Sequence, residues 1–210
     1  MRPFAIALIL ASTIIAPAFG QEKKQMTALD FKMKSIDGKE LDLAGFKGRV
    51  VLFVNVASEC GYTDQYVGLQ KLHESMGKDG LVIVGVPSNE FGNQEPGTDA
   101  QIKKFCETRY KVAFPMLAKV VVKGTGQVPL YKHLTSKETN PKFGGEIGWN
   151  FEKFLIGRDG SIAGRFAADV EPDNEDFVAM QAIIAMHLNE FWKHANAHAG
   201  KVTWRLDVGY

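Results

Sequence analysis

The sequence predicts a single α/β domain in which helices flank a central mixed β-sheet. Two nearly continuous apolar runs rich in β-branched residues, 49–56 and 81–86, are typical of strands buried on both faces. Between them, residues 63–78 carry apolar side chains at helical spacing, and Gly80 follows as a left-handed cap. Strand, helix and strand in this order predict a right-handed crossover and a parallel strand pair.

Turn and capping signals predict the elements on either side of this unit. Asp37-Gly38 predicts a hairpin turn within residues 29–43. After a loop at 87–97, Thr98 and Gln101 form a capping box that begins a helix, with Ile102, Phe105 and Tyr110 on one face. The remaining expected elements are a short strand at 118–122, a helical turn at 129–134, an antiparallel hairpin of 151–156 with 162–167, and a final helix at 174–194. This pattern predicts a thioredoxin-like fold, with its first two sheet strands parallel and its last two antiparallel.

The first twenty residues have the features of a secretory signal peptide. Arg2 gives a positive start, residues 4–15 are apolar, and residues 18–20 form a small-x-small cleavage site. The alternative is a retained membrane anchor, but an apolar run of about a dozen residues is short of the roughly 20 that span a bilayer. We therefore expect an exported, periplasmic protein, cleaved near Gly20 and without stable membrane insertion.

Composition and charge exclude several classes of protein. With 45% hydrophobic and 23% charged residues, the chain has the composition of an ordinary soluble domain. Cleavage would remove Arg2 from 25 Lys and Arg, leaving 24 against 24 Asp and Glu. A neutral protein has no bulk attraction to nucleic acid or an anionic membrane. The only cysteines, Cys60 and Cys106, are too few for a disulfide-dense scaffold.

Cys60 lies just past the carboxyl end of the first buried strand and directly before the 63–78 helix. Open α/β sheets form binding crevices at that edge, and a helix N-terminus favours an anion, so the position favours a nucleophilic thiolate. A thioredoxin-type reductase would have a second cysteine three residues on, where this chain has Thr63. A lone thiol that is regenerated from elsewhere suits peroxide reduction through a sulfenic acid.

Three segments resemble, in the correct order, the active-site segments of glutathione peroxidases. They are residues 54–63 (VNVASECGYT), 89–97 (NEFGNQEPG) and 149–155 (WNFEKFL). The resemblance covers residues 29–188, and it implies a glutathione peroxidase-like domain at 27–192 followed by a C-terminal extension, 193–210, with no assigned role.

The resemblance places the family's catalytic tetrad on Cys60, Gln94, Trp149 and Asn150, with cysteine where some animal members have selenocysteine. The chemistry supports this assignment, since indole and amide N–H donors would stabilise the thiolate and the charge developing on a leaving hydroxide or alkoxide. Taken singly, each residue also has a purely structural interpretation. Cys60 could be a small buried hydrophobic residue, and Gln94 could be a solvated loop residue. Trp149 could be a core residue followed by Asn150 in a turn.

Cys106 has two interpretations. In family members that use thioredoxin, a resolving cysteine lies in this region, but by position it falls on Glu107 here. One residue rotates a helical side chain by roughly 100°, so Cys106 is either the resolving cysteine or a residue of the helix core. Resolution would require the two sulfurs to reach bonding distance, with local unwinding. A permanent disulfide would silence Cys60.

The resemblance implies a peroxidase that reduces hydrogen peroxide and organic or lipid hydroperoxides, regenerated by glutathione or a thioredoxin-like protein. It implies no metal or prosthetic group, and the short 122–148 segment favours a monomer. His194 and His198 have a metal-like spacing, but a solvated tail explains them better because no further ligand completes a set. The alternatives are a thiol-disulfide oxidoreductase acting on exported proteins and a redox sensor that signals through a Cys60–Cys106 bond.

Overall fold

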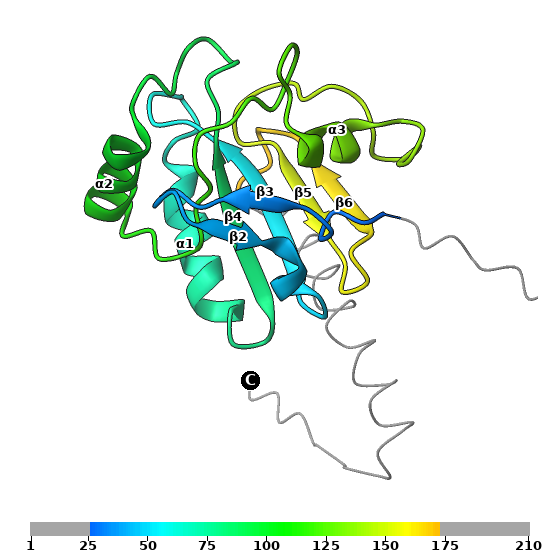
Figure 1. Ribbon diagram of the computed structural model, residues 1–210. Helices are drawn as coiled ribbons and strands as arrows, with labels where there is room; N and C mark the ends of the chain where they lie inside the picture. Colours follow the sequence, from blue (N-terminus) through cyan, green and yellow to red (C-terminus); the bar gives the residue numbers. More distant parts are fainter. Residues whose placement is uncertain (1–25, 173–210) are drawn as a thin grey trace, which may run out of the picture.

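The computed structural model describes residues 26–172, and these residues form a four-stranded mixed sheet with helices on both faces (Figure 1). The strand order is β4 (Leu81–Pro87), β3 (Val50–Val56), β5 (Lys153–Ile156) and β6 (Ile162–Phe166). The expected signal peptide, the expected 174–194 helix, and His194 and His198 lie outside the described residues.

The sheet confirms the predicted parallel pair and the predicted antiparallel hairpin. β3 runs parallel to β4 from Val50 opposite Leu81 to Val56 opposite Pro87, and every residue of both strands is buried. β5 pairs antiparallel with β3 on its other side, and β6 pairs antiparallel with β5. β3 is therefore the central strand, and the loop at its carboxyl end emerges from the middle of the sheet.

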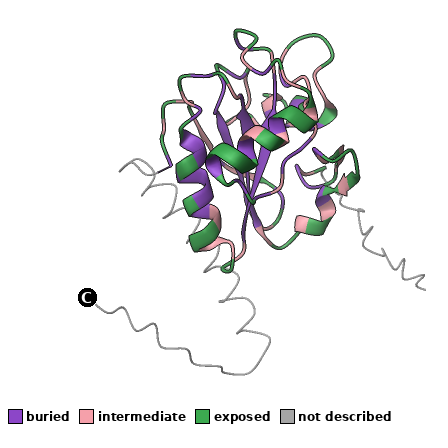
Figure 2. Cartoon of the chain, turned by 90° about the vertical axis from the view of Figure 1, so that its left-hand side faces the viewer, coloured by how far each residue is buried: buried purple, intermediate pink, exposed green. Residues whose placement is uncertain are grey.

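Alternate residues of β3 pack into two separate hydrophobic clusters, one on each face of the sheet. Val50, Leu52, Val54 and Val56 pack with α1 (Gln65–Met76) and α2 (Asp99–Tyr110), whose inward sides are buried (Figure 2). Val51 and Phe53 pack with α3 (Pro129–Thr135) and the N-terminal hairpin of β1 (Lys32–Lys34) and β2 (Glu40–Asp42), which leads into the short 3-10 helix η1 (Leu43–Phe46). The predicted hairpin, capping box and 129–134 helical turn are confirmed.

The sequence prediction is wrong at residues 118–122 and at Gly80. Residues 118–122 form no strand, because the chain changes partners after each residue: the Leu117 N–H donates to the Gly85 carbonyl at 2.8 Å and the Ala118 N–H to the Lys34 carbonyl at 2.9 Å. The first long helix ends at Met76, so Gly80 does not cap it. Gly80 instead adopts a φ of +105° in the turn that leads into β4.

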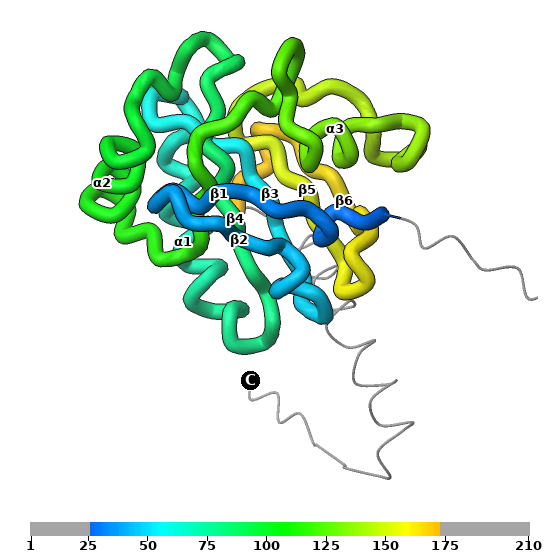
Figure 3. The backbone as a smooth tube through the Cα atoms, viewed as in Figure 1, coloured from blue at the N-terminus to red at the C-terminus, as the bar shows by residue number. Residues whose placement is uncertain are grey.

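The connections that carry the predicted site residues lie at one end of the sheet. The loop after β3, the loop after β4 and the segment before β5 gather at the upper end of the molecule in Figure 3. Parallel strands end at the same edge of a sheet, and the antiparallel β5 begins there, which brings three distant parts of the chain together.

Candidate active site

Cys60 lies in a turn between β3 and α1 and is 9% exposed. The expectation that it directly precedes a helix is corrected, because α1 begins only at Gln65. The intervening residues form successive tight turns, in which the Thr63 N–H donates to the Cys60 carbonyl at 3.1 Å and the Tyr66 N–H donates to the Thr63 carbonyl at 3.1 Å. This geometry leaves the Tyr62 N–H to donate to Cys60 Sγ at 3.4 Å. A backbone N–H dipole therefore points at the sulfur.

The buried hydroxyl of Thr63 fixes this turn. Thr63 Oγ1 accepts a hydrogen bond from the Cys60 N–H at 3.0 Å. It also lies 3.0 Å from the Ala57 carbonyl oxygen and 2.7 Å from the Cys60 carbonyl oxygen, to which it can donate. A single side chain thus joins the end of β3 to the residue that carries the thiol.

Gln94, Asn150 and Trp149 meet at the same end of the sheet. The Asn150 Nδ2 donates to Gln94 Oε1 at 2.9 Å, and the Gln94 carbonyl accepts the N–H of Glu59, the neighbour of Cys60, at 3.0 Å. The Trp149 carbonyl accepts a hydrogen bond from the side chain of Asn55 in β3 at 3.0 Å. Asn150 is fully buried, whereas the Trp149 side chain is exposed at 41% and tilts against Phe91 at 6.0 Å between ring centroids.

Hydrogen bonds therefore join the loops that carry the predicted site residues, rather than joining Gln94 or Trp149 to Cys60 itself. Within residues 26–172, the hydrogen bond to Cys60 Sγ comes from Tyr62, and none from Gln94 or Trp149 reaches the sulfur. Trp149 and Tyr62 line the same surface hollow, together with Gly148, Glu152, Ala167, Ala168 and Asp169. Because Gln94 Oε1 accepts from Asn150, the amide is oriented and its Nε2 remains a donor.

Cys106 faces the interior of the domain from α2. The buried positions of this helix are Ile102, Cys106 and Tyr110, spaced by four, while Phe105 is only partly buried and Glu107 is exposed. Cys106 and Cys60 belong to the same hydrophobic cluster, and both are free thiols. Burial raises the pKa of the Cys106 thiol to about 11, so this thiol is protonated at neutral pH.

The burial of two ionisable side chains was not predicted from the sequence. Glu95 is 1% exposed, and burial raises its pKa to about 7. Lys153 is fully buried in β5, where burial lowers its pKa to about 7; its ammonium donates to Gln65 Oε1 at 2.6 Å and to the Val170 carbonyl at 2.5 Å. Both residues stand inside the motif segments, but no sequence pattern distinguishes a buried charge from a solvated one.

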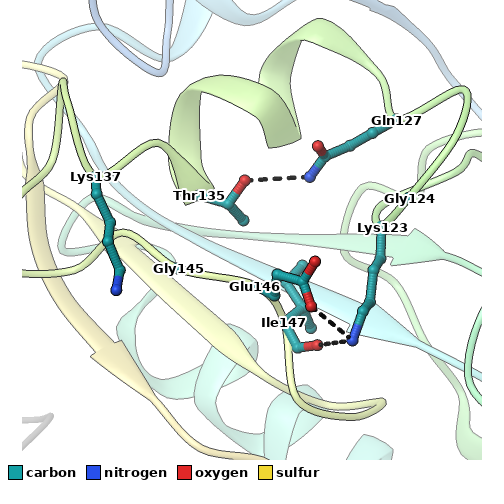
Figure 4. Close-up of a pocket in the computed structure, with 8 residues that line it drawn as sticks. All are labelled: Lys123, Gly124, Gln127, Thr135, Lys137, Gly145, Glu146 and Ile147. Carbon is teal, nitrogen blue, oxygen red and sulfur yellow. Dashed lines mark hydrogen bonds and ion pairs between the residues drawn. The ribbon is translucent and has the colours of Figure 1, made fainter.

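A further hollow lies between α3 and the segment before β5 (Figure 4). Several of its polar groups are paired: Lys123 contacts the Glu146 carboxylate and the Ile147 carbonyl, both at 3.3 Å, and Gln127 donates to Thr135 at 3.1 Å. None of the predicted site residues lines it.

In the described part of the chain, no helix is long and apolar enough to cross a membrane, and no three His, Cys, Asp or Glu side chains cluster as metal ligands.

A thiol at the carboxyl end of the central strand of a thioredoxin-like sheet defines an oxidoreductase that works through cysteine. The family model described as glutathione peroxidase matches residues 28–135. The chain belongs to the glutathione peroxidase family.

Individual relatives agree with this assignment. The chain is 45% identical over 152 residues to the hydroperoxy fatty acid reductase gpx1 of Synechocystis, covering 70% of this chain and 90% of that protein. It is 43% identical over 147 residues to the glutathione peroxidase homolog BsaA of Bacillus subtilis, covering 70% and 92%. Among solved structures, Trgpx in its apo form matches with a TM-score of 0.62 and 36% identity, over 78% of this chain and 96% of that one. The fold is thus thioredoxin-like, and the protein is a peroxidase that reduces peroxides with thiol electrons.

Proposed function

We propose that Cys60 is the residue that a hydroperoxide oxidises. The observation that carries this proposal is the Tyr62 N–H, which donates to Cys60 Sγ at the carboxyl end of β3. The thiolate attacks one peroxide oxygen, the O–O bond breaks, and the other oxygen leaves with a proton as water or an alcohol. Cys60 becomes a sulfenic acid, and the peroxide is reduced by two electrons.

Gln94, Trp149 and Asn150 are the proposed polar frame for this step. Asn150 orients the Gln94 amide, so that Gln94 Nε2 and the Trp149 indole N–H serve as donors to the leaving oxygen. Asn150 acts through Gln94 and is a positioning residue, since its own Nδ2 is engaged by Gln94 and lies 3.4 Å from the Phe91 carbonyl.

The proposed substrates are hydrogen peroxide and organic hydroperoxides, including those of lipids. Two observations support a bulky apolar substrate. A relative carries the name hydroperoxy fatty acid reductase. The exposed Trp149 ring lines a hollow with Tyr62 and two alanines, and Glu152 and Asp169 also line it. An acyl chain lying on this surface would bring its hydroperoxide toward the turn that holds Cys60.

Cys106 is the proposed resolving cysteine. Its side chain faces the cluster that contains Cys60, whereas the neighbouring position 107 faces solvent, so the one-residue shift from the family pattern favours Cys106. Attack of Cys106 on the sulfenic acid would form a disulfide that a thioredoxin-like protein or glutathione reduces.

The proposed site of action is the periplasm, which the signal-like residues 1–20 support. The proposed oligomeric state is a monomer, which the short 122–148 segment supports.

The test is mass spectrometry of the protein after one equivalent of hydrogen peroxide without added thiol. Wild type should lose two hydrogens as the Cys60–Cys106 disulfide forms, and Cys106→Ala should stop at the Cys60 sulfenic acid. Cys60→Ser should lower peroxide turnover by about 10³-fold or more, since the nucleophile is removed. A Cys60→Ser protein with normal turnover would refute the assignment.

Export is tested separately, by sequencing the N-terminus of the protein recovered from the periplasm. A protein that begins near Gln21 would support export, and a protein retained whole in the cytoplasm would contradict it.

A further inference from the structure

Arg165 of β6 holds together the segment that leads to Trp149. Its Nη1 donates to the carbonyls of Phe143 at 2.8 Å and Gly145 at 3.0 Å. Its Nη2 donates to the Glu146 carbonyl at 2.7 Å. A guanidinium presents its donors as a rigid planar fork, so three bonds to one segment fix the path of that segment.

The Nε of the same guanidinium forms an ion pair with Glu152 that is largely buried. The side chains of Arg165 and Glu152 are exposed at only 16% and 9%. The second carboxylate oxygen, Glu152 Oε2, accepts the N–H of Gly148 at 2.7 Å, and Gly148 directly precedes Trp149. The Glu152 carbonyl accepts the N–H of Asn55 in β3 at 3.3 Å, so the backbone that carries this carboxylate is fixed to the central strand.

Arg165 is itself held in place by the sheet. It stands opposite Phe154 of β5 in the strand register, and its guanidinium lies over the Phe154 ring, 4.8 Å from the ring centroid. A residue on a paired strand is less mobile than a residue in a surface loop. Arg165 therefore transmits the rigidity of the sheet to the loop at 143–148.

The Trp149 indole depends on this support, because its ring is 41% exposed and packs against Phe91 on the surface of the domain. Its backbone is fixed on both sides: the Trp149 carbonyl accepts from the side chain of Asn55 at 3.0 Å, and the Gly148 N–H before it donates to Glu152. Gly148, Trp149 and Glu152 line the same surface hollow. The bond to Glu152 thus sets where the indole enters that hollow.

We propose that Arg165, acting through Glu152, is a positioning residue for the Trp149 indole in the reduction of peroxide. This inference rests on the proposed role of Trp149 as a donor to the leaving oxygen. Without Arg165, the buried Glu152 carboxylate would lose its ion-pair partner and would turn toward water, which releases the Gly148 N–H. The indole N–H would then move away from the leaving oxygen, and a misplacement of about 1 Å can slow a reaction about 100-fold.

The experiment is a double-mutant cycle between Arg165 and Trp149 in the full-length protein. The measured quantity is the second-order rate constant for oxidation of Cys60 by hydrogen peroxide, followed by rapid-quench mass spectrometry. Arg165→Met should lower this rate constant by about 10-fold or more in the wild-type background. In the Trp149→Phe background, which already lacks the indole N–H, the same substitution should lower it by less than about 2-fold. A merely structural role for Arg165 would slow both backgrounds by the same factor.

Arg158→Met is the matched control. Arg158 lies in the turn between β5 and β6 and also donates to a backbone carbonyl, that of Gly48, at the opposite end of the hairpin from Trp149. Its replacement should change the rate constant by less than about 2-fold. Thermal unfolding of each variant reports whether it folds. If Arg165→Met does not fold, Arg165→Lys takes its place in the cycle, because it keeps the positive charge but lacks the planar fork.

The outcomes separate the inference from the proposed function. If Trp149→Phe is oxidised as fast as wild type, the proposed donor role of Trp149 fails and the inference falls with it. If Trp149→Phe is slow and the Arg165 substitution slows both backgrounds equally, or slows neither, the donor role stands and Arg165 does not act through Trp149.

Discussion

The Thr63 hydroxyl fixes the turn that carries the proposed nucleophile, Cys60. Its Oγ1 accepts the Cys60 N–H and lies within hydrogen-bond distance of the carbonyls of Ala57 and Cys60, all inside the protein. Without it, the buried Cys60 N–H would have no acceptor, and such a group costs about 1–3 kcal/mol. Thr63 therefore stabilises the fold and directs the Tyr62 N–H toward the sulfur in the same turn.

Thr63→Val should lower the free energy of unfolding by about 1–3 kcal/mol, because it keeps the shape of the side chain and deletes its hydrogen bonds. It should also slow Cys60 oxidation, since the turn is no longer fixed. Urea unfolding and stopped-flow peroxide kinetics measure the two effects. The control is Thr108→Val, which removes an exposed hydroxyl that bonds the Lys104 carbonyl and should change stability by under about 0.5 kcal/mol. Equal effects of the two substitutions would contradict this role for Thr63.

For single residues, the sequence predicted which loops lie near one another but not which atoms are in contact. The motifs placed Cys60, Gln94, Trp149 and Asn150 in one site, and the structure brings their loops together. The backbone donor of Tyr62 and the buried carboxyl of Glu95 were not predicted. A hydrogen bond from a backbone N–H depends on turn geometry, and a pKa depends on burial, so neither can be inferred from residue type.

The helix α2 carries Cys106, the proposed resolving cysteine, and both of its ends are well defined. Its N-terminus is closed by reciprocal bonds, in which Thr98 accepts from the Gln101 N–H and the Gln101 side chain accepts from the Thr98 N–H at 2.8 Å. Its C-terminus ends at Lys111 in the left-handed conformation, with a φ of 57°. The capping box was predicted from the sequence because it depends on two residue types at a fixed spacing.

Thr98→Ala should destabilise α2, and with it the protein, by about 1 kcal/mol, because a helix N–H loses its cap. If α2 must unwind locally, the same substitution should speed formation of the Cys60–Cys106 disulfide rather than slow it. Denaturant unfolding and mass spectrometry at timed intervals measure both. Thr139→Ala, in an exposed turn outside α2, is the control and should leave the disulfide rate unchanged. A stable Thr98→Ala protein with slower disulfide formation would argue against unwinding.

The sequence predicted that the helix α1 exists, but it did not predict where this helix begins and ends. The helical spacing of Tyr66, Leu69 and Leu72 identified α1, but the tight turns before it carry apolar and polar residues that read equally well as helix. The failed strand at 118–122 has the same origin, since strand propensity cannot reveal that successive residues bond to β4 and to β1 in turn.

At the scale of the whole molecule, two buried charges shape the dependence of stability on pH. Burial raises the pKa of Glu95 from 4.5 to about 7, so the folded state holds more protons between these values and stability falls as pH rises. Burial lowers the pKa of Lys153 from 10.5 to about 7, so the unfolded state holds more protons between these values and stability rises with pH. Together, they contribute a minimum of stability near pH 7.

Lys153→Met should remove the rise in unfolding free energy between about pH 7 and pH 10.5, a contribution on the order of a few kcal/mol in wild type. The measurement is urea unfolding at intervals across this range. Lys71→Met, at an exposed position of α1, is the matched control and should keep the wild-type slope. Parallel curves for wild type and Lys153→Met would mean that the buried ammonium, with its carbonyl acceptors, keeps its proton throughout.

The position of β5 beside β3 has a consequence for the newly made chain. Trp149 is bonded to Asn55, 94 residues earlier, and this contact joins the last third of the domain to its central strand. The parallel pair of β3 and β4 and the helices α1 and α2 are complete by Tyr110. The Cys60 thiol therefore leaves the ribosome well before Trp149 and Asn150, and the proposed polar frame can form around it only after the segment before β5 has been made.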